Sequence, residues 1–331
     1  MPILILTVLL ALIFILSALL LWGLLRLFGR TVRFRSLAGR FLIAFCIAVP
    51  VFVFLVTPVL FSELLSRASS RPQDRIPADP PDRTDIEFFP VSFPSRDSLT
   101  IRGWYLPGTE KPACIMGHGL FRSRNEMLER GCRLNRLGYP VLLFDFRSHG
   151  ISDPGPVTLG VRERLDVLGA CDYLKREKGH SKPVYCGVSM GAVAGLLAAA
   201  DSGQPIRAVI ADSPYDDLRR SVGKHVGMLL GLPEFPFADI FLWRLERNGS
   251  FNADSFRPVD QIGNLESTPV LFIFGSKDKR MDRPVAENLF AAALPGHKAI
   301  HFFPGAGHGA AYITDPDRYI SLIDQLIYSL E

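Results

Sequence analysis

The most constraining feature of this sequence is the motif GVSMG at residues 187–191, which separates two segments of different character. The apolar run 184–186 before it is typical of a buried strand, and the alanine-rich run after it is typical of a helix. A strand that turns sharply into a helix needs small residues such as Gly187 and Gly191, because the two backbones approach closely. The motif therefore predicts a strand, a tight turn and a helix, with the hydroxyl of Ser189 raised above the edge of a sheet.

Short apolar runs alternate with longer segments of helical period throughout residues 85–331, which indicates an α/β fold with crossover helices. Eight strands are predicted, at residues 86–93, 99–105, 113–116, 141–145, 184–186, 208–211, 270–274 and 299–303. Helices are predicted at residues 124–137, 161–177, 190–200, 285–294 and 315–329. The strand at 141–145 is apolar almost throughout, so we expect a mostly parallel sheet with helices on both faces.

Residues 214–267 form an interval that is too long for a loop inside a compact domain. The interval is apolar and aromatic, with proline and glycine breaks, so we predict a small helical insertion between the sixth and seventh strands. Such an insertion can cover a substrate, or it can simply pack against the body of the domain. The sequence leaves both roles open.

The first 62 residues contain five arginines and no acidic residue, although the whole chain has 33 acidic residues. Residues 1–25 carry no charge, and a second uncharged run covers residues 41–62. Each run is long enough to cross a hydrocarbon core of about 30 Å as a helix, so we predict two transmembrane spans, at about 2–25 and 41–62. The first run, residues 1–25, lacks the basic start and the small-residue cleavage site of a signal peptide, so we interpret it as a membrane span.

The charge around these spans predicts their orientation. A short loop rich in arginine favours the cytoplasm, which places both ends of this hairpin, and the domain after it, outside. Three arginines after the second span weaken that contrast. A Pro- and Arg-rich linker at residues 63–84 is expected to tether the hairpin to the domain. Because the five arginines exceed the net charge of +4, the rest of the chain is slightly acidic, and nucleic acid is not an expected partner.

A serine hydroxyl becomes a nucleophile only with a base and an acid that orients the base. The seventh predicted strand is followed by Asp278, and the eighth by His308 between two glycines. Loops at the carboxyl ends of parallel strands share one edge, so Ser189, Asp278 and His308 are expected to meet there. Asp282 is the alternative acid. Four other histidines lie in or before a strand, at a helix end or in the insertion, and are not expected to act as the base: His301, His297, His180 and His225.

Acyl transfer also requires N–H donors for the oxyanion that develops on the carbonyl. The backbone N–H of Met190, directly after the serine, is one candidate, and the N–H of Leu120 in the loop after the third strand is the other. Gly119 lets this loop fold under the site. We expect His118 to shape the loop by hydrogen bonding rather than to act as a base.

Taken together, these motifs resemble the α/β-hydrolase superfamily over about residues 84–331. The segment DFRSHGIS at residues 145–152 is similar to one found in its esterase, lipase and serine aminopeptidase-like branch. In that branch the segment shapes the loop beside the serine, which implies structural roles for Asp145, Arg147 and His149. A serine at the turn departs from epoxide hydrolases and haloalkane dehalogenases, which have an aspartate there.

The sequence thus predicts a membrane-anchored serine hydrolase that cleaves an acyl ester or thioester, with a lipophilic small molecule as substrate and the lipid bilayer as partner. The alternatives are a serine peptidase-like hydrolase, a non-catalytic binding module of the same fold, or a membrane interaction protein that acts through its hairpin. No cofactor or metal is expected, because no His, Cys, Asp or Glu cluster has the spacing of metal ligands. The oligomeric state stays open.

Overall fold

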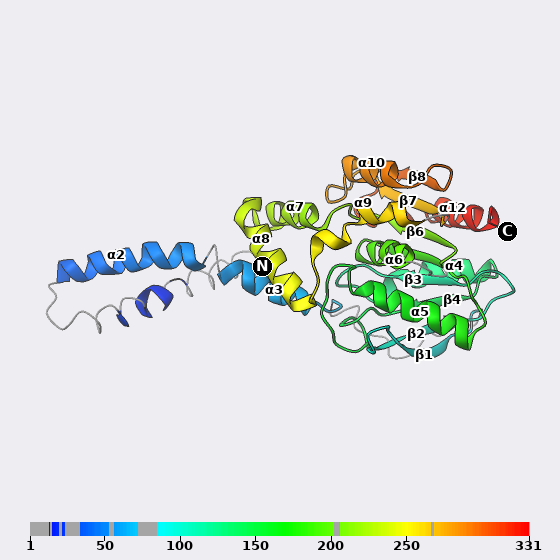
Figure 1. The fold of residues 1–331 in the computed structure, drawn as a ribbon, viewed down its shortest axis with the longest axis horizontal. Coiled ribbons are helices and arrows are strands. Elements are labelled where there is room, and N and C mark those ends of the chain that lie inside the picture. The colour runs from blue at the N-terminus through cyan, green and yellow to red at the C-terminus, as the bar shows by residue number, and fades with distance from the viewer. Residues whose placement is uncertain are drawn as a thin grey trace.

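The computed structural model describes residues 13, 15–19, 22–23, 34–52, 56–71, 85–201, 206–265 and 268–330. Eight strands form one sheet in the order β1-β2-β4-β3-β5-β6-β7-β8 (Figure 1). The strands are β1 Phe89–Pro94, β2 Thr100–Leu106, β3 Cys114–Gly117, β4 Val141–Phe144, β5 Val184–Val188, β6 Ala208–Asp212, β7 Val270–Gly275 and β8 Lys298–Phe303. Only the β1–β2 and β2–β4 pairs are antiparallel, so the predicted eight-stranded, mostly parallel sheet is confirmed.

Helices cover both faces of the sheet, and each face has its own apolar core. The helices outside the insertion are α4 Asn125–Arg136, α5 Glu163–Glu177, α6 Met190–Ala200, α10 Arg283–Ala292, α11 Ala311–Thr314 and α12 Pro316–Tyr328. Buried side chains of α5, α6 and α10 form one core against the sheet, and those of α4 and α12 form the other. Strands β3, β4, β5 and β6 are buried along their whole length because the helices exclude water from both faces.

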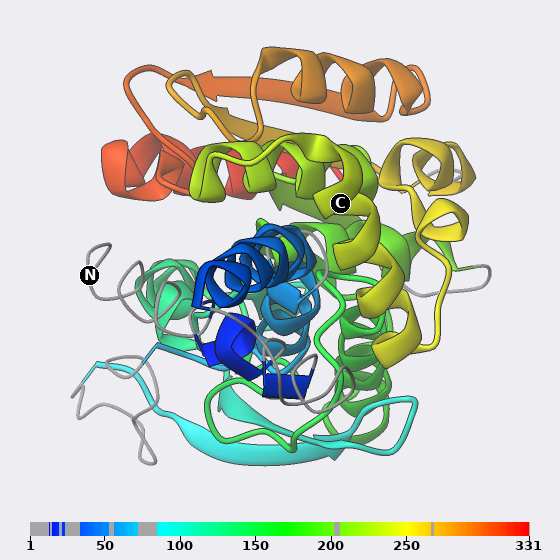
Figure 2. The same cartoon turned by 90° about the vertical axis from the view of Figure 1, so that its left-hand side faces the viewer.

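The interval between β6 and β7 is helical, as predicted. It contains α7 Leu218–Leu230, α8 Glu234–Gly249, η3 Ala253–Phe256, α9 Pro258–Gln261 and η4 Ile262–Leu265. The carboxylate of Asp217 caps α7 by accepting a hydrogen bond from the N–H of Arg220, and Gly231 ends the helix in the left-handed conformation (φ 65°). Helices α7 and α8 lie together at the end of the domain from which the N-terminal helices emerge (Figure 2).

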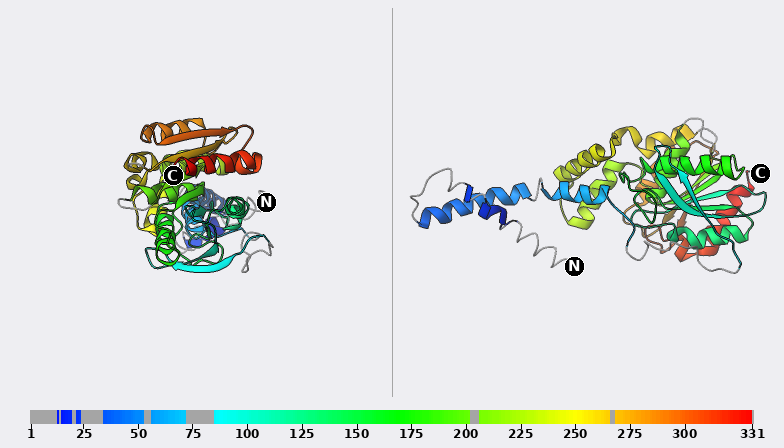
Figure 3. Two further views of the ribbon diagram at one scale, coloured as in Figure 1. Left: turned by 90° about the vertical axis from the view of Figure 1, so that its right-hand side faces the viewer. Right: turned by 90° about the horizontal axis from the view of Figure 1, so that it is seen from below.

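The described residues before the α/β domain include α2 Phe34–Val51 and α3 Thr57–Ser66, and residues 15–19 are helical as well. Helix α2 extends away from the domain, whereas α3 packs against α8 (Figure 3). Most of the predicted span at 2–25 lies outside the described residues. The predicted span at 41–62 is divided between α2 and α3. Within the described segments, no helix combines the length and the apolar character that a membrane crossing requires.

The predicted linker, residues 63–84, begins later than expected. Residues 63–66 belong to α3, and the Glu63 carboxylate accepts hydrogen bonds from two side chains of α8, both at 3.0 Å. The carbonyl of Ser66 accepts a hydrogen bond from the loop after β4 (2.9 Å), and the Ser70 hydroxyl donates one to the loop after β3 (2.6 Å). Ala68 is buried in the core and Leu65 packs against it, so both polar and apolar groups attach this segment. Residues 72–84 lie outside the described residues.

Candidate active site

Ser189 occupies a strained turn between β5 and α6. Its backbone has φ 53° and ψ −115°, a conformation that a non-glycine residue adopts only where its surroundings enforce it. The flanking glycines explain how strand and helix fit: a Cβ atom on Gly187 would lie 2.6 Å from the carbonyl of Gly191. A Cβ atom on Gly191 would lie 2.6 Å from the carbonyl oxygen of Gly117. Both glycines are therefore needed for the geometry that the motif predicts.

The three expected side chains lie in one hydrogen-bonded row. Nδ1 of His308 is 2.8 Å from Oδ2 of Asp278, and Nε2 of His308 is 2.9 Å from Oγ of Ser189. Because an ionised carboxylate can only accept, Nδ1 carries the proton and Nε2 is free to accept the Ser189 proton. Burial alone raises the pKa of Asp278, but hydrogen bonds from His308 and from two backbone N–H groups hold that pKa below its ordinary value.

The competing residues occupy other positions. Asp282 stands at the start of α10, where its carboxylate accepts a hydrogen bond from Nζ of Lys224 (2.6 Å). His180 contacts the hydroxyl of Tyr105 instead of the site. Among the described residues, only His308 has a ring nitrogen within hydrogen-bonding distance of the Ser189 hydroxyl. The geometry therefore pairs the serine with His308, and His308 with Asp278.

Two backbone donors stand beside the serine. Leu120 and Met190 line the same cavity as Ser189. Within the part of the chain that the structure describes, neither of their backbone N–H groups has an acceptor. Unpaired N–H groups facing a cavity can bind a developing oxyanion, which is the role expected for both residues.

His118 holds the loop that carries Leu120. Its Nδ1 is 2.7 Å from the carbonyl oxygen of Gly119, and its Nε2 accepts a hydrogen bond from the N–H of Phe146 (3.0 Å). Burial, with His149 nearby, lowers its pKa well below the ordinary value, so the ring is neutral. These contacts agree with the structural role expected for His118, because both ring nitrogens are occupied by backbone groups.

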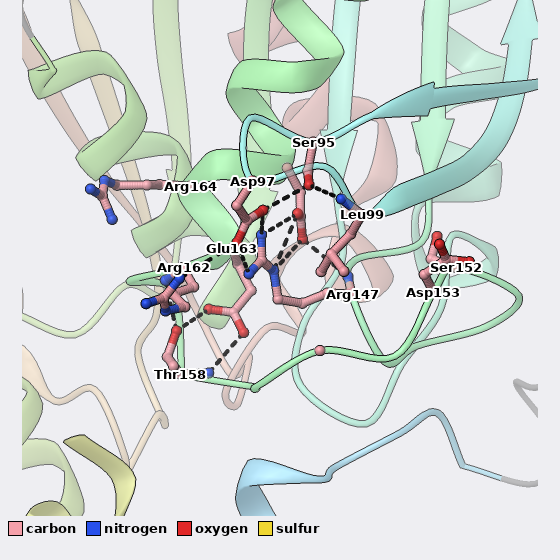
Figure 4. A network of polar contacts seen from close by, with 12 residues as sticks. Ser95, Asp97, Leu99, Arg147, Ser152, Asp153, Thr158, Arg162, Glu163 and Arg164 are labelled. Atoms are coloured by element: carbon pink, nitrogen blue, oxygen red, sulfur yellow. Dashed lines mark hydrogen bonds and ion pairs between the residues drawn. The ribbon is translucent and has the colours of Figure 1, made fainter. Parts of the chain in front are cut away.

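The segment 145–152 supports the site from behind through buried ion pairs. Arg147 donates to the carboxylate of Asp97 (2.8 Å; Figure 4) and to that of Asp166 (2.7 Å). Burial alone lowers the pKa of Arg147, but these carboxylates raise it above the ordinary value, so the guanidinium stays charged. Asp145 binds the main chain and side chain of Arg124. These partners are structural, and none of them reaches Ser189.

A cavity of about 760 Å³ opens at Ser189 and His308. Side chains from the insertion line it, among them Val222, His225 and Phe241, and so do Leu65 and Arg71 from the N-terminal segment. Sequence reasoning did not place any of these five residues at the site. The apolar character of the insertion was the available signal for the first three. Leu65 belongs to α3, which packs against α8, and Arg71 is held by a hydrogen bond from its N–H to the carbonyl of Phe121 (2.8 Å).

No group of three or more His, Cys, Asp or Glu side chains that could hold a metal ion is found in the described ranges.

A parallel sheet with a serine turn after β5, an acid after β7 and a histidine after β8 defines the α/β-hydrolase class of protein. The chain belongs to the alpha/beta hydrolase family, whose model matches residues 115–322.

Individual relatives extend the comparison. The chain is 26% identical to the protein YqkD of Bacillus subtilis (strain 168) over 237 residues, which cover 71% of this chain and 77% of that protein. It is 29% identical to the lysophosphatidylserine lipase ABHD12 of Danio rerio over 183 residues, covering 52% and 45% of the two chains. The esterase Pf2001 of Pyrococcus furiosus has the same fold, with a TM-score of 0.64, 21% identity and coverage of 79% and 98%.

Proposed function

We propose that this protein is a membrane-anchored serine hydrolase that cleaves a lipophilic acyl ester or thioester. The observation that carries the proposal is the row of contacts from Ser189 through His308 to Asp278, at the wall of a cavity of about 760 Å³. This arrangement suits acyl transfer, because a base must touch the nucleophile and an acid must orient the base.

In the acylation step, Oγ of Ser189 attacks the substrate carbonyl while Nε2 of His308 accepts the hydroxyl proton. The N–H groups of Leu120 and Met190 bind the oxyanion. The bond to the leaving group then breaks, and His308 returns the proton to the departing alcohol or thiol. Asp278 stabilises the imidazolium that forms between these two transfers.

In the deacylation step, a water molecule attacks the acyl-enzyme while His308 accepts one of its protons. Collapse of the second tetrahedral intermediate releases the carboxylic acid and returns the proton to Ser189. The reaction consumes one water for each ester cleaved and needs no further reactant.

A lipophilic substrate is supported by the cavity wall. Val222 and Val226 of α7 and Phe241 of α8 contribute apolar surface. The similar proteins also support a lipophilic ester as the substrate: one relative is a lysophosphatidylserine lipase, and one structural neighbour is an esterase.

Anchoring in a membrane is supported by the two uncharged runs at the N-terminus. Helices α2 and α3 expose apolar side chains to the surroundings: Leu42, Ile43, Phe45, Ile47, Val51, Leu60 and Leu64. The exposed Trp243 of α8 lies under the guanidinium of Arg247, 5.3 Å away, a pairing that suits a membrane–water interface. A lipid bilayer would cover these groups.

The test is to label the full chain in membrane fractions with a fluorophosphonate probe and to measure ester hydrolysis. We expect Ser189→Ala to abolish labelling and to lower ester hydrolysis at least about 10³-fold. Ser276→Ala is the matched control, since Ser276 is exposed on a neighbouring loop, where its hydroxyl only accepts a hydrogen bond from Gly305. Labelling that persists in Ser189→Ala contradicts the proposal. A wild-type chain that does not label at all favours a binding module.

A further inference from the structure

The cavity at Ser189 is lined by an excess of basic side chains. They come from the N-terminal segment, from the loop after β3 and from the loop between β7 and α10: Arg71, Arg122, Lys277, Lys279 and Arg280. Among the described residues, two acidic side chains line it, and both have partners. Glu126 accepts a hydrogen bond from the N–H of Gly119 (2.7 Å) and lies 3.5 Å from Arg122, while Asp278 holds His308.

The three cations of the β7–α10 loop form no ion pair with the described part of the chain. Lys277, Lys279 and Arg280 are exposed, and in the described part of the chain none of their side chains has a carboxylate partner. Lys224, on the neighbouring α7, does have one in Asp282, at 2.6 Å. Unpaired cations beside a concave, partly apolar site attract an anion, because the surrounding low-dielectric wall focuses their field.

The position of this loop relates the cations to one end of the substrate. Asp278 stands between Lys277 and Lys279 in the chain, and it is the residue that holds His308. In the proposed reaction His308 gives its proton to the leaving group, so the leaving group lies at His308. The cations that flank Asp278 line the same cavity as His308, and Arg280 also lies close enough to His225 of α7 to lower its pKa. The apolar side chains of α7 and α8 provide surface for the acyl chain in this cavity.

From this arrangement we propose that the preferred substrate is an acyl ester whose alcohol part carries a phosphate or carboxylate anion, bound by Lys277, Lys279 and Arg280. The inference rests on the proposed function. It adds that the site selects the charge of the alcohol part as well as the length of the hydrocarbon chain.

The experiment compares esters that share one oleoyl chain, presented to the full chain in neutral detergent micelles. The probes are 1-oleoylglycerol (neutral), oleoyl lysophosphatidylcholine (zwitterionic), oleoyl lysophosphatidylglycerol (a phosphate anion) and O-oleoyl lactate (a carboxylate anion). We expect kcat/KM for at least one anionic ester to exceed that of 1-oleoylglycerol roughly tenfold, mainly through KM, and the ratio to shrink in high salt. Comparison of the two anionic esters shows whether the site prefers a phosphate or a carboxylate.

The variant Lys277→Gln/Lys279→Gln/Arg280→Gln is expected to bring the ratio of anionic to neutral kcat/KM close to one. The single variant Lys279→Gln should lower the ratio part of the way, and Lys279→Arg should retain it. The matched control is Lys175→Gln/Lys182→Gln, because both lysines are exposed and Lys182 precedes β5, at the opposite edge of the sheet. This control should keep the wild-type ratio.

Failure of this inference differs from failure of the proposed function. If the wild type hydrolyses neutral and anionic esters equally well, or if the triple variant keeps the wild-type ratio while labelling with fluorophosphonate, the anion site is wrong and the hydrolase stands. If the wild type neither labels nor cleaves any of the esters, the proposed function itself is wrong. Thermal midpoints of the variants show whether a lost ratio reflects unfolding, and the single Lys279 variants then decide the outcome.

Discussion

Asp278 and Asp282 lie four positions apart in the chain, yet their surroundings differ. The carboxylate of Asp278 is buried and contacts His308, whereas that of Asp282 is partly exposed and contacts Lys224. We expect Asp278→Asn to lower kcat for ester hydrolysis by roughly 10³- to 10⁴-fold, because the amide favours the wrong tautomer of the histidine. Asp282→Asn serves as the matched control and should change kcat less than about threefold. Steady-state kinetics with one soluble ester measures both, and a larger loss in Asp282→Asn contradicts the assignment.

Asp212, at the end of β6, is a buried carboxylate that the sequence motifs do not single out. Its Oδ1 accepts a hydrogen bond from Ser213 (3.0 Å), and its Oδ2 has no hydrogen-bond partner in the described part of the chain. Burial raises the pKa of Asp212 to about 6, although Arg130 nearby opposes the shift. The folded protein therefore holds this proton more tightly than the unfolded chain does.

This shift predicts a pH dependence of stability. Because the pKa is raised from 3.8 to about 6 on folding, the stabilisation from this group is complete below pH 3.8 and is lost as the pH rises through 6. Two pKa units correspond to about 3 kcal/mol as an order of magnitude. Asp212→Asn should therefore gain thermal stability relative to the wild type between pH 4.5 and pH 7. A difference in thermal midpoint that is the same at both pH values contradicts the shift.

At the scale of elements, the insertion is the part of the fold that shapes the cavity. Its α7 and α8 contribute Val222, Val226, Met228 and Phe241 to the wall. Burying each substrate CH₂ there adds about 0.8 kcal/mol at most. We expect kcat/KM for p-nitrophenyl acetate, butyrate and octanoate to rise roughly two- to fourfold per carbon until the pocket is full.

The matched variants for this series lie on the insertion itself. Met228 lines the cavity and is 47% exposed, so Met228→Gln should flatten the series without unfolding the domain. Trp243 is 51% exposed and does not line the cavity, so Trp243→Gln should leave the slope unchanged. A wild-type series that is flat, or that falls from acetate, means that the insertion only packs against the sheet.

The C-terminal end of helix α3 is predicted as part of the linker, but its tertiary contacts attach it to the domain. Its charged and polar C-terminal end has the composition of a tether, yet Glu63 and Ser66 bind α8 and the loop after β4. Leu65, between them in the chain, then lines the cavity. Burial of polar groups against distant partners leaves no periodic signal, and so a window of sequence cannot detect it.

For the whole molecule, the arginines between the two uncharged runs predict an orientation. If residues 26–40 face the cytoplasm, alkaline phosphatase fused to the C-terminus should be active in a bacterial host, and a fluorescent protein at the same position should be dark. Fusions placed after residue 33, inside the loop, are the control and should give the opposite pair of results. An active fluorescent protein at the C-terminus places the catalytic domain in the cytoplasm.

Much of the fold and of the candidate site follows from local sequence. Strands such as β4 and β5 are short apolar runs bounded by turn residues, and the serine, aspartate and histidine each stand in the turn or loop that follows a strand. Parallel strands present their carboxyl ends at one edge, so knowing the strands is enough to bring the three loops together. The hydrogen bonds of His308 agree with that expectation.

The sequence by itself determined the order of strands and helices, the strained turn at Ser189 and the choice of residues at the sheet edge, because each depends on neighbours a few positions away. Only the tertiary structure shows that Asp278 contacts His308 while Asp282 contacts Lys224. It also attaches α3 to the domain and gathers Arg71, Arg122 and the cations of the β7–α10 loop around one cavity. These outcomes depend on which distant side chains lie within a few ångströms of one another. Hydrogen bonds and electrostatic attraction act over such distances in space, whatever the separation along the chain.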